Sequence, residues 1–302
     1  MNRNSAGLLM LLAAIWGGSF FFIRLAVGAL GPWLLVEVRV AVAALVLGVV
    51  VLLGRGHFVV RTHWRQFLIL GIFNAALPFT LIAFAELRLT ASYGAILNAT
   101  TPMFSVIIAA LWLHDPISLK KVGGLLMGVI GVAILVGLTA QQFDPLVLLS
   151  VGASLAGALS YGFGGIYAAR NFRGVPPLQL SLGQQASAAL VLLPFAVTHL
   201  PNSTPSLAVV GAVLGLGVLC TALAYLLYFR LIAQVGATNT LVVTLLVPVF
   251  GILWGAALLH ESITLATVAG AVTIFASVVL VTNMTLRAKR QGAVAIEGTT
   301  EE

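Results

Sequence analysis

The sequence predicts an all-α integral membrane protein with ten transmembrane helices in two inverted five-helix repeats. Composition is the first reason: 61% of the 302 residues are hydrophobic and 8% are charged, which leaves too few polar side chains to cover a soluble protein. The second is a series of apolar runs, each long enough to cross roughly 30 Å of hydrocarbon as a helix. The third is a stretch that occurs twice, at 91–118 and at 237–264.

The apolar runs define the helices in order. The first run follows a short basic start and is too long for the hydrophobic region of a signal peptide, so we expect it to be retained as a membrane helix. Because backbone groups in lipid must be hydrogen-bonded within their own segment, runs of this length are helices rather than strands. The short segments between them leave no room for a soluble domain. The predicted helices are 6–27, 32–53, 66–86, 91–112, 121–138, 145–169, 177–198, 207–229, 237–259 and 264–284.

A shift of 146 positions aligns the two copies of the repeated stretch without a gap, with seven identities in 28 positions. The matches include a mid-helix proline (Pro102 and Pro248) and a histidine before an acid (His114 and His260), which we expect to cap a helix end. We interpret the match as an internal repeat. The predicted units are a five-helix repeat at 1–140, a second five-helix repeat at 145–284 and a disordered cytoplasmic tail at 285–302.

Lysine and arginine residues in the connecting segments set the orientation of a membrane protein. With the N-terminus in the cytoplasm, twelve of these residues fall inside, and only Arg24 and Arg88 fall outside. The asymmetry predicts that both termini are cytoplasmic. Because each unit holds an odd number of helices, the two units must then be inverted relative to each other. Inverted repeats are the architecture of secondary transporters, whose substrate site lies near the midplane between the halves.

Composition and motifs also indicate what the protein does not bind. The formal charge of +7 does not point to nucleic acid, because the basic residues stand singly or in pairs between apolar runs. The single cysteine, Cys220, lies in an apolar run, where packing is its expected role. We find no phosphate-binding loop and no His or Cys pair at metal-ligand spacing in the predicted helices, so we expect no cofactor and no metal. The expected partners are a small-molecule substrate and the lipid bilayer, and no feature sets an oligomeric state.

Three stretches resemble the EamA-type transporters of the drug/metabolite transporter superfamily. They are IWGGSFFFIRLA in the first predicted helix, Pro32 with Arg39 in the second, and NATTPMF in the fourth. The second unit carries the pattern more loosely, in GATNTLVVTLLVPVFGILWG followed by ESIT. The resemblance covers the chain as far as Met284. It implies a bacterial inner-membrane permease, often an exporter of amino acids or other small metabolites. It also implies a central cavity lined by helices 1–4 and 6–9, with helices 5 and 10 at the periphery.

Charged residues inside membrane helices are costly and call for an explanation. Glu37 and Arg39 lie in the outer half of the second predicted helix, and Glu37 departs from the family pattern, which has an apolar or small residue there. With Arg24, Glu86 and Arg88, we expect them to form one external cluster, which either balances its own charge or binds a carboxylate at Arg39. Glu37 is the only carboxylate well inside a predicted helix, so it is the candidate proton carrier if transport is coupled to protons.

Neutral polar and aromatic residues at midplane depth in several helices favour a cavity, although such residues also bond membrane helices to one another. A proline frees a carbonyl one turn earlier, where it lines a cavity or lets the helix bend. A lining of rings, amides and hydroxyls suits a neutral or zwitterionic solute with an apolar part. The predicted substrate-binding residues are Trp16, Ser19, Phe20, Arg39, Asn74, Pro78, Asn98, Thr101, Tyr161, Gln184, Tyr225, Tyr228, Asn239 and Thr244.

These features predict a secondary transporter that exports amino acids or related solutes by alternating access. Two other classes stay open. An integral membrane enzyme acting on a lipid needs polar residues at one membrane face, and the predicted cytoplasmic face offers His57, His63, His114 and Asp115. A passive facilitator is supported only by the external charges. Lipid turnover by the purified protein identifies the enzyme, and counterflow distinguishes a carrier from an open pore.

Overall fold

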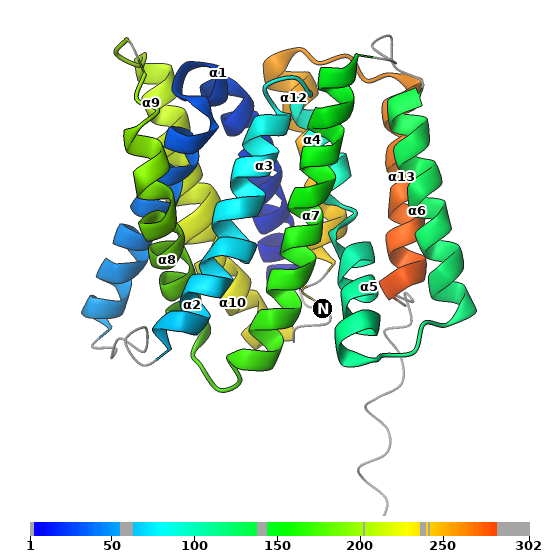
Figure 1. Cartoon of the computed structure of the whole chain (residues 1–302), viewed down its shortest axis with the longest axis horizontal. Helices are drawn as coiled ribbons and strands as arrows, with labels where there is room; N and C mark the ends of the chain where they lie inside the picture. The colour runs from blue at the N-terminus through cyan, green and yellow to red at the C-terminus, as the bar shows by residue number, and fades with distance from the viewer. Residues whose placement is uncertain are drawn as a thin grey trace, which may run out of the picture.

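The computed structural model describes residues 3–54, 63–137, 144–201, 203–235, 240 and 242–282. Over these ranges the chain forms helices and no strand, as the predicted all-α class requires (Figure 1). In chain order the elements are α1 (Arg3–Leu53), α2 (Trp64–Gly71), the π-helical η2 (Ile72–Ala76), α3 (Leu77–Ala85), α4 (Ala91–Asn98), α5 (Thr101–Leu113), α6 (Leu119–Gly137), α7 (Pro145–Asn171), α8 (Pro177–Val197), α9 (Leu207–Leu214), the π-helical η3 (Gly215–Leu223), α10 (Ala224–Val235), α12 (Val243–Leu259) and α13 (Leu265–Thr282).

Within the described ranges, eight helical segments are long and apolar enough to span a membrane, and α12 is a shorter apolar helix. The first of the eight is α1, which breaks at Gly31 (φ 69°, ψ 162°) and turns back there (Figure 1). Glycine adopts this conformation at little cost, and Pro32 follows it. The two arms of α1 are therefore two crossings, matching the predicted helices 6–27 and 32–53, and the described crossings number ten.

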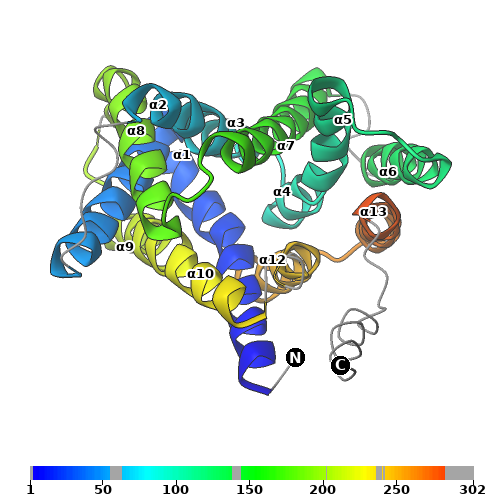
Figure 2. The ribbon, with the colours of Figure 1, turned by 90° about the horizontal axis from the view of Figure 1, so that it is seen from below.

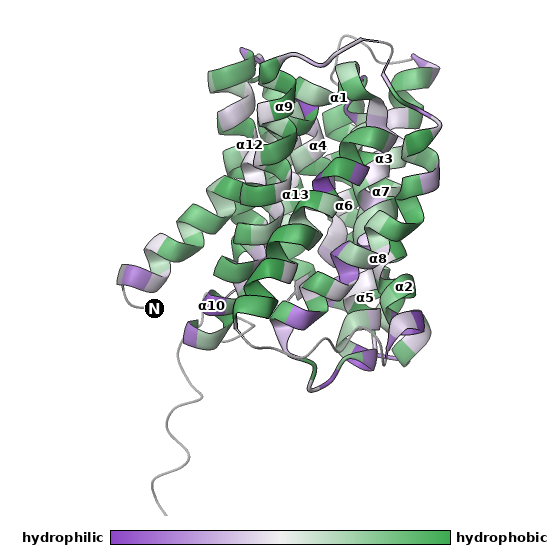
Figure 3. Ribbon diagram, turned by 90° about the vertical axis from the view of Figure 1, so that its left-hand side faces the viewer, coloured by the Kyte–Doolittle hydropathy of each residue, from purple (hydrophilic) through white to green (hydrophobic). Residues whose placement is uncertain are grey.

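The helices are hydrophobic along most of their length, and hydrophilic residues gather toward the ends of the bundle (Figure 3). Large side chains such as Leu119, Leu207 and Leu265 are 90%, 91% and 81% exposed. Contiguous apolar surface of this kind is not found on soluble monomers. It is the surface that a multi-pass membrane protein presents to lipid.

Three of the predicted helices are not regular along their length. The third is α2–η2–α3, in which the π-helical turn precedes Pro78. A proline ring clashes with the carbonyl four residues earlier, here that of Asn74, and a wider turn relieves the clash. The fourth is divided between α4 and α5 just before Pro102. The eighth is α9–η3–α10, in which Thr221 Oγ1 donates to the Leu216 carbonyl, five residues earlier, at 2.8 Å.

Helices α6 and α13 pack against each other at one edge of the bundle, away from α8, α9 and α10 (Figure 2). Glycines allow the close approach: a Cβ on Gly124 would lie 3.0 Å from Leu280 Cβ, and one on Gly270 would lie 2.9 Å from Leu135 Cβ. This is the peripheral place that the family resemblance implies for the fifth and tenth helices.

The two copies of the repeated stretch fold alike. His114 ends α5 with φ 58° and ψ 29°, and His260 ends α12 with φ 55° and ψ 32°. In each copy the N–H of the following acid, Asp115 or Glu261, bonds to the carbonyl six residues earlier, at 3.4 and 3.1 Å. These are left-handed helix caps, as expected for the histidines. The α5–α6 and α12–α13 connections lie at opposite ends of the bundle (Figure 1), the arrangement expected of an inverted repeat. In the predicted orientation the first is the inner end and the second the outer end.

Candidate functional site: a cavity between the repeats

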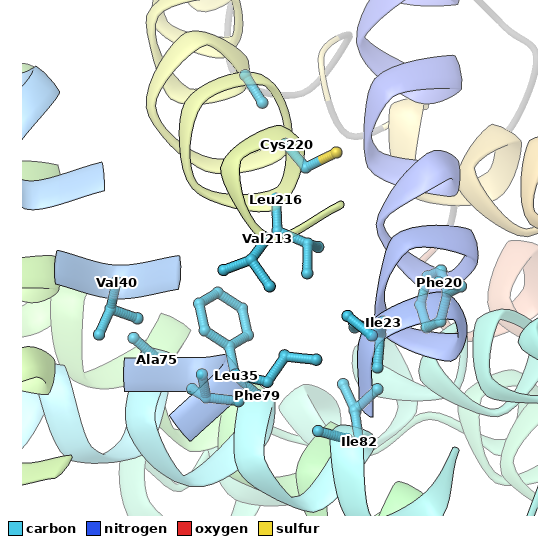
Figure 4. Packing of buried hydrophobic residues seen from close by; sticks show 14 of the residues in the cluster. Phe20, Ile23, Leu35, Val40, Ala75, Phe79, Ile82, Val213, Leu216 and Cys220 are labelled. Atoms are coloured by element: carbon cyan, nitrogen blue, oxygen red, sulfur yellow. The ribbon is translucent and has the colours of Figure 1, made fainter. Parts of the chain in front are cut away.

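A cavity of about 370 Å³ lies inside the bundle, a size typical of small-molecule sites. Helices α6 and α13 contribute none of its described wall. Figure 4 shows the packing around part of it, where side chains of α1, α3 and η3 meet. The lining residues are Trp16, Ser19, Phe20, Ile23, Arg39, Asn74, Phe79, Ile82, Ala95, Asn98, Ala99, Thr101, Pro102, Tyr161, Cys220, Tyr225, Tyr228, Thr244, Val247 and Pro248.

The wall is built from matching positions of the two repeats. Six lining residues of the first unit have a lining residue 146 positions later, the offset that aligns the repeated stretch, and Trp16 has Tyr161 at an offset of 145. This coincidence follows if the two units fold alike and enclose the cavity between them. The pairs at 146 are Asn74 and Cys220, Phe79 and Tyr225, Ile82 and Tyr228, Asn98 and Thr244, Thr101 and Val247, and Pro102 and Pro248.

The π-helical turns are part of this correspondence. Asn74 lies in η2 and Cys220 lies in η3, so each unit brings a widened helical turn to the wall at an equivalent position. The Cys220 thiol lies 3.1 Å from the Ile15 carbonyl of α1. The cysteine is packed, as expected, but it also lines the cavity. π-helical turns recur at functional sites because they re-aim side chains relative to a regular helix.

Arg39 is the only charged residue in the described wall. Its side chain is 5% exposed. Nε donates to Thr221 Oγ1 at 3.0 Å, and the guanidinium carbon lies 3.6 Å from the centroid of the Phe79 ring. Within the described part of the chain, the two terminal nitrogens make no hydrogen bond. The guanidinium is therefore fixed by one edge and one face, and its other donors are free for a ligand.

An amide network backs the wall. Asn74 Nδ2 donates to Gln184 Oε1 at 2.7 Å, and Gln184 Nε2 donates to the Tyr225 hydroxyl at 3.0 Å. Gln184 therefore lies behind the wall and holds a lining residue of each unit, rather than lining the cavity itself. These two hydrogen bonds hold the Asn74 amide and the Tyr225 hydroxyl in place without a bridging water.

Asn98 presents an acceptor that has no partner. Its Oδ1 is buried and makes no hydrogen bond within the described residues. Its backbone carbonyl accepts from Thr101 Oγ1 at 2.8 Å, in the turn where Pro102 lacks an N–H. A buried polar atom without a partner costs free energy. In a cavity wall such an atom is available to a donor on a ligand.

The predicted charge cluster forms only in part, because Arg24 and Arg39 both act electrostatically on the Glu86 carboxyl. Arg39 lines the cavity instead of the outer surface, because its long side chain turns inward to Thr221. Arg24 Nη1 donates to the backbone carbonyl of Glu86, and Arg88 is exposed. Glu37 is 8% exposed, its Oε2 has no hydrogen-bond partner among the described residues, and it does not line the cavity.

Most of the predicted substrate-binding residues lie in the wall. The exceptions are Pro78 and Gln184, which are buried outside it, and Asn239, which lies outside the described residues. Contact with a substrate stays a prediction for all of them. The predicted residues that line the cavity are Trp16, Ser19, Phe20, Arg39, Asn74, Asn98, Thr101, Tyr161, Tyr225, Tyr228 and Thr244.

Sequence reasoning missed several apolar lining residues. Phe79 and Ile82 were not singled out, although they stand 146 positions before the predicted residues Tyr225 and Tyr228. Applying the repeat offset to each predicted residue is the signal that identifies them. Ile23 has no such signal, because an isoleucine in an apolar run looks the same whether it faces lipid, protein or cavity.

The bundle is closely packed at the start of α4, which is its outer end in the predicted orientation. Glu261 accepts hydrogen bonds from the N–H groups of Ala91 (2.7 Å) and Ser92 (3.0 Å) and from the Ser92 hydroxyl (2.5 Å). A carboxylate after α12, in the second unit, thus caps the first turn of α4, in the first unit. Further in, a Cβ on Gly251 of α12 would overlap Ala95 of α4. Helix α4 is mostly buried, whereas α5 has a single buried residue, so the packing loosens toward the inner end.

Comparison with known proteins adds independent findings. The model of the EamA-like transporter family matches the chain twice, at residues 4–137 and at 148–283. A solved structure titled "Crystal structure of protein" superposes with a TM-score of 0.65 at 21% sequence identity, covering 93% of this chain and 98% of its own. That likeness shows a shared fold.

Curated relatives are similar over most of both chains. "Protein PecM" of Dickeya dadantii is 26% identical over 288 residues, which is 94% of this chain and 94% of the relative. A "Probable amino-acid metabolite efflux pump" of Salmonella typhimurium is 25% identical over 293 residues, 91% of this chain and 94% of the relative. An "Uncharacterized transporter" of Archaeoglobus fulgidus is 25% identical over 265 residues, 87% and 92% of the two chains.

Proposed function

The chain belongs to the EamA-like transporter family, and on that premise we propose that it is a secondary transporter that exports amino acids or related small solutes by alternating access. Membership makes it a multi-pass membrane transporter of a small molecule rather than an enzyme. The solute class, the direction and the mechanism are the proposed part. The proposed location is the bacterial inner membrane with both termini in the cytoplasm, on the strength of the lysine and arginine asymmetry.

Arg39 is the observation that supports the solute class. A buried guanidinium with no bonded carboxylate is costly unless an anion completes it. Thr221 occupies Nε, and the terminal nitrogens keep the forked geometry that matches a carboxylate. Asn98 Oδ1 offers an acceptor for an ammonium or another donor on the same solute. An amino acid carries both groups, and the aromatic and aliphatic part of the wall suits an apolar side chain.

Export is supported by the name of one relative, the "Probable amino-acid metabolite efflux pump" of Salmonella typhimurium. Alternating access is supported by the paired lining residues and by the helix breaks beside them. η2, η3 and the α4–α5 break all lie at the cavity, where a change in helix direction repacks the wall. The sequence has no nucleotide-binding motif, so a gradient must supply the energy, and proton coupling is included in the proposal.

Counterflow in proteoliposomes tests the proposal. Vesicles that hold purified protein and one unlabelled amino acid are expected to accumulate the labelled form of that amino acid transiently, with no membrane potential. A matched set of competitors then identifies the groups that are bound: phenylalanine, phenethylamine, which lacks the carboxylate, and 3-phenylpropionate, which lacks the ammonium.

Compounds with a carboxylate are expected to compete, and phenylalanine best, because it reaches both Arg39 and Asn98. Counterflow that phenethylamine inhibits as well as phenylalanine does would remove the carboxylate from the proposal. Labelled uptake that unlabelled solute on the opposite side does not stimulate would identify a passive facilitator instead.

A further inference from the structure

Glu86 is a buried carboxyl that the proposed solute site does not use. It follows α3 at the outer end and is 0% exposed. Neither Oε1 nor Oε2 has a hydrogen-bond partner among the described residues. Its backbone groups are bonded: the N–H donates to the Ile82 carbonyl at 2.9 Å, and the carbonyl accepts from Arg24 Nη1.

The carboxyl lies between the cavity and the closed outer end. A Cβ on Gly94 of α4 would be 3.1 Å from Glu86 Oε1 and 3.2 Å from Phe20 Cδ1, so Phe20, a lining residue, and Glu86 meet at one turn of α4. That turn directly follows Ala91 and Ser92, which Glu261 caps. Because Glu261 joins the start of α4 to the α12–α13 connection, opening this end would separate the two, and Glu86, at the next turn of α4, would then gain access to water.

The charges around Glu86 do not neutralise it. Arg24 is the cation that acts on it most strongly, and its hydrogen bond is to the backbone carbonyl of Glu86 rather than to the carboxyl. Arg39, in the cavity wall, favours the ionised form of Glu86. Glu261, which caps α4, disfavours it, because the two negative charges would repel each other. An ionised carboxylate with no hydrogen bond costs far more in a buried site than in water, whereas the neutral acid costs little more than any unpaired polar group. The closed outer end therefore fits a protonated Glu86.

We propose that Glu86 is the proton-binding site of the transporter and that its protonation closes the outer end. The inference rests on the proposed export by alternating access. A ligand shifts a conformational equilibrium by its differential affinity for the two states. Here the ligand is a proton, and the closed outer state binds it more tightly than the open, hydrated one.

The resulting cycle takes one proton inward for each closure of the outer end. With the outer end open, the Glu86 carboxylate takes a proton from the external water. The neutral acid is buried as α4 and α12 close, and the cavity communicates with the inner side. When the outside is more acidic than the cytoplasm, the neutral acid gives its proton to water on the cavity side, and the pH gradient supplies the free energy of this step. The ionised Glu86 that remains disfavours the closed outer end, so the next opening to the outside carries the solute out.

Glu37 provides the matched comparison. It is also a buried glutamate with an oxygen that lacks a partner, but it is 8% exposed and lies outside the α4–α12 closure. A role in coupling is placed at Glu86 rather than Glu37 because only Glu86 sits where opening the outer end changes its surroundings.

The test compares Glu86→Gln with Glu37→Gln in full-length protein. Purified protein is reconstituted with a pH-sensitive dye inside the vesicles, and two rates are measured: counterflow of the amino acid, and proton movement driven by a gradient of that amino acid. Glutamine reproduces the shape of the protonated acid. We expect Glu86→Gln to lose proton movement and to slow counterflow, because its outer end opens less often, and Glu37→Gln to keep both.

The outcomes separate the two proposals. If wild-type protein shows no counterflow with any carboxylate solute, the proposed function is overturned. Wild type with counterflow but without proton movement overturns the role of Glu86 alone. So does a Glu86→Gln protein that still moves protons, that keeps wild-type counterflow or that misfolds, since glutamine mimics the neutral acid that the closed outer end holds.

A second readout follows the conformation directly. Cys220 is the single cysteine and lines the cavity, so an impermeant maleimide added outside reports an open outer end. Raising the pH from 6 to 8 is expected to increase this labelling in wild type more than in Glu86→Gln. Both proteins carry the same thiol, so its own titration cancels in the comparison, and equal pH dependence contradicts the proposal.

Discussion

Arg39 shows what the context of one residue predicts and what it does not. A lone arginine in an apolar run needs a reason, so the sequence identifies it as a candidate. The direction of its side chain depends on Thr221, which is 182 positions away in the chain, and no local pattern predicts that contact. The expected external cluster forms only in part for this reason: a long side chain places its charge well away from its own Cα.

Removing the guanidinium is expected to weaken solute binding. Charge-assisted hydrogen bonds contribute about 1.5–3 kcal/mol, so Arg39→Gln should raise the half-saturating concentration of carboxylate solutes in counterflow by about 10- to 100-fold. Arg39→Lys keeps the charge but loses the forked pair of donors, so its half-saturating concentration should lie between those of wild type and Arg39→Gln. The exposed Arg88→Gln is the matched control and should match wild type. An unchanged Arg39→Gln protein would show that the guanidinium is structural.

Thr221 is expected to act by positioning Arg39. Thr221→Val keeps the shape and removes the acceptor of Nε, which should weaken binding of carboxylate solutes by about fivefold, since one hydrogen bond contributes about 1 kcal/mol. Thr80→Val is the control, because Thr80 is equally buried and its hydroxyl has no partner among the described residues. Equal effects of the two substitutions on half-saturation would assign the loss at Thr221 to packing.

At the scale of the helix, hydropathy alone predicts the ten crossings, because lipid permits no other backbone structure for apolar runs of this length. The prolines predict some of the irregular turns but not all. Pro78 and Pro102 stand beside η2 and the α4–α5 break, whereas Pro248 lies inside a continuous α12. η3 contains no proline, and its wide turn is stabilised by the Thr221 hydroxyl. Such turns depend on contacts between helices, which hydropathy does not contain.

The cap of α4 by Glu261 is expected to keep the outer end closed. Glu261→Gln removes a charge-assisted cap from three donors, so the outer end should open more often and external maleimide should label Cys220 faster. Asp144→Asn is the control, because Asp144 caps α7 through Leu146 and takes no part in the α4–α12 contact. Equal labelling of Cys220 in the two variants would argue that the cap does not hold the gate.

At the scale of the molecule, the repeat was readable because one stretch kept its proline and its histidine cap in both copies. The cavity that the repeats enclose was predictable in part. Polar and aromatic residues at midplane depth identified much of its wall, since such residues are costly against lipid. The apolar part of the wall was missed, because an apolar side chain is equally suited to lipid, core and cavity. The paired offsets of Phe79 and Ile82 show that symmetry recovers some of what polarity does not.

The inverted arrangement itself can be tested with equivalent positions. Pro116 follows the cap of α5 and Ser262 follows the cap of α12, 146 positions later, and both are exposed. In a Cys220→Ser background, Ser262→Cys should react with an impermeant maleimide added to intact cells, and Pro116→Cys should react only after the membrane is made permeable. The reason is geometric, since the two connections lie at opposite ends of the bundle (Figure 1). Labelling of both cysteines from one side would mean that the repeats are parallel in the membrane. Alternating access by exchange of conformation between two inverted repeats would then be ruled out.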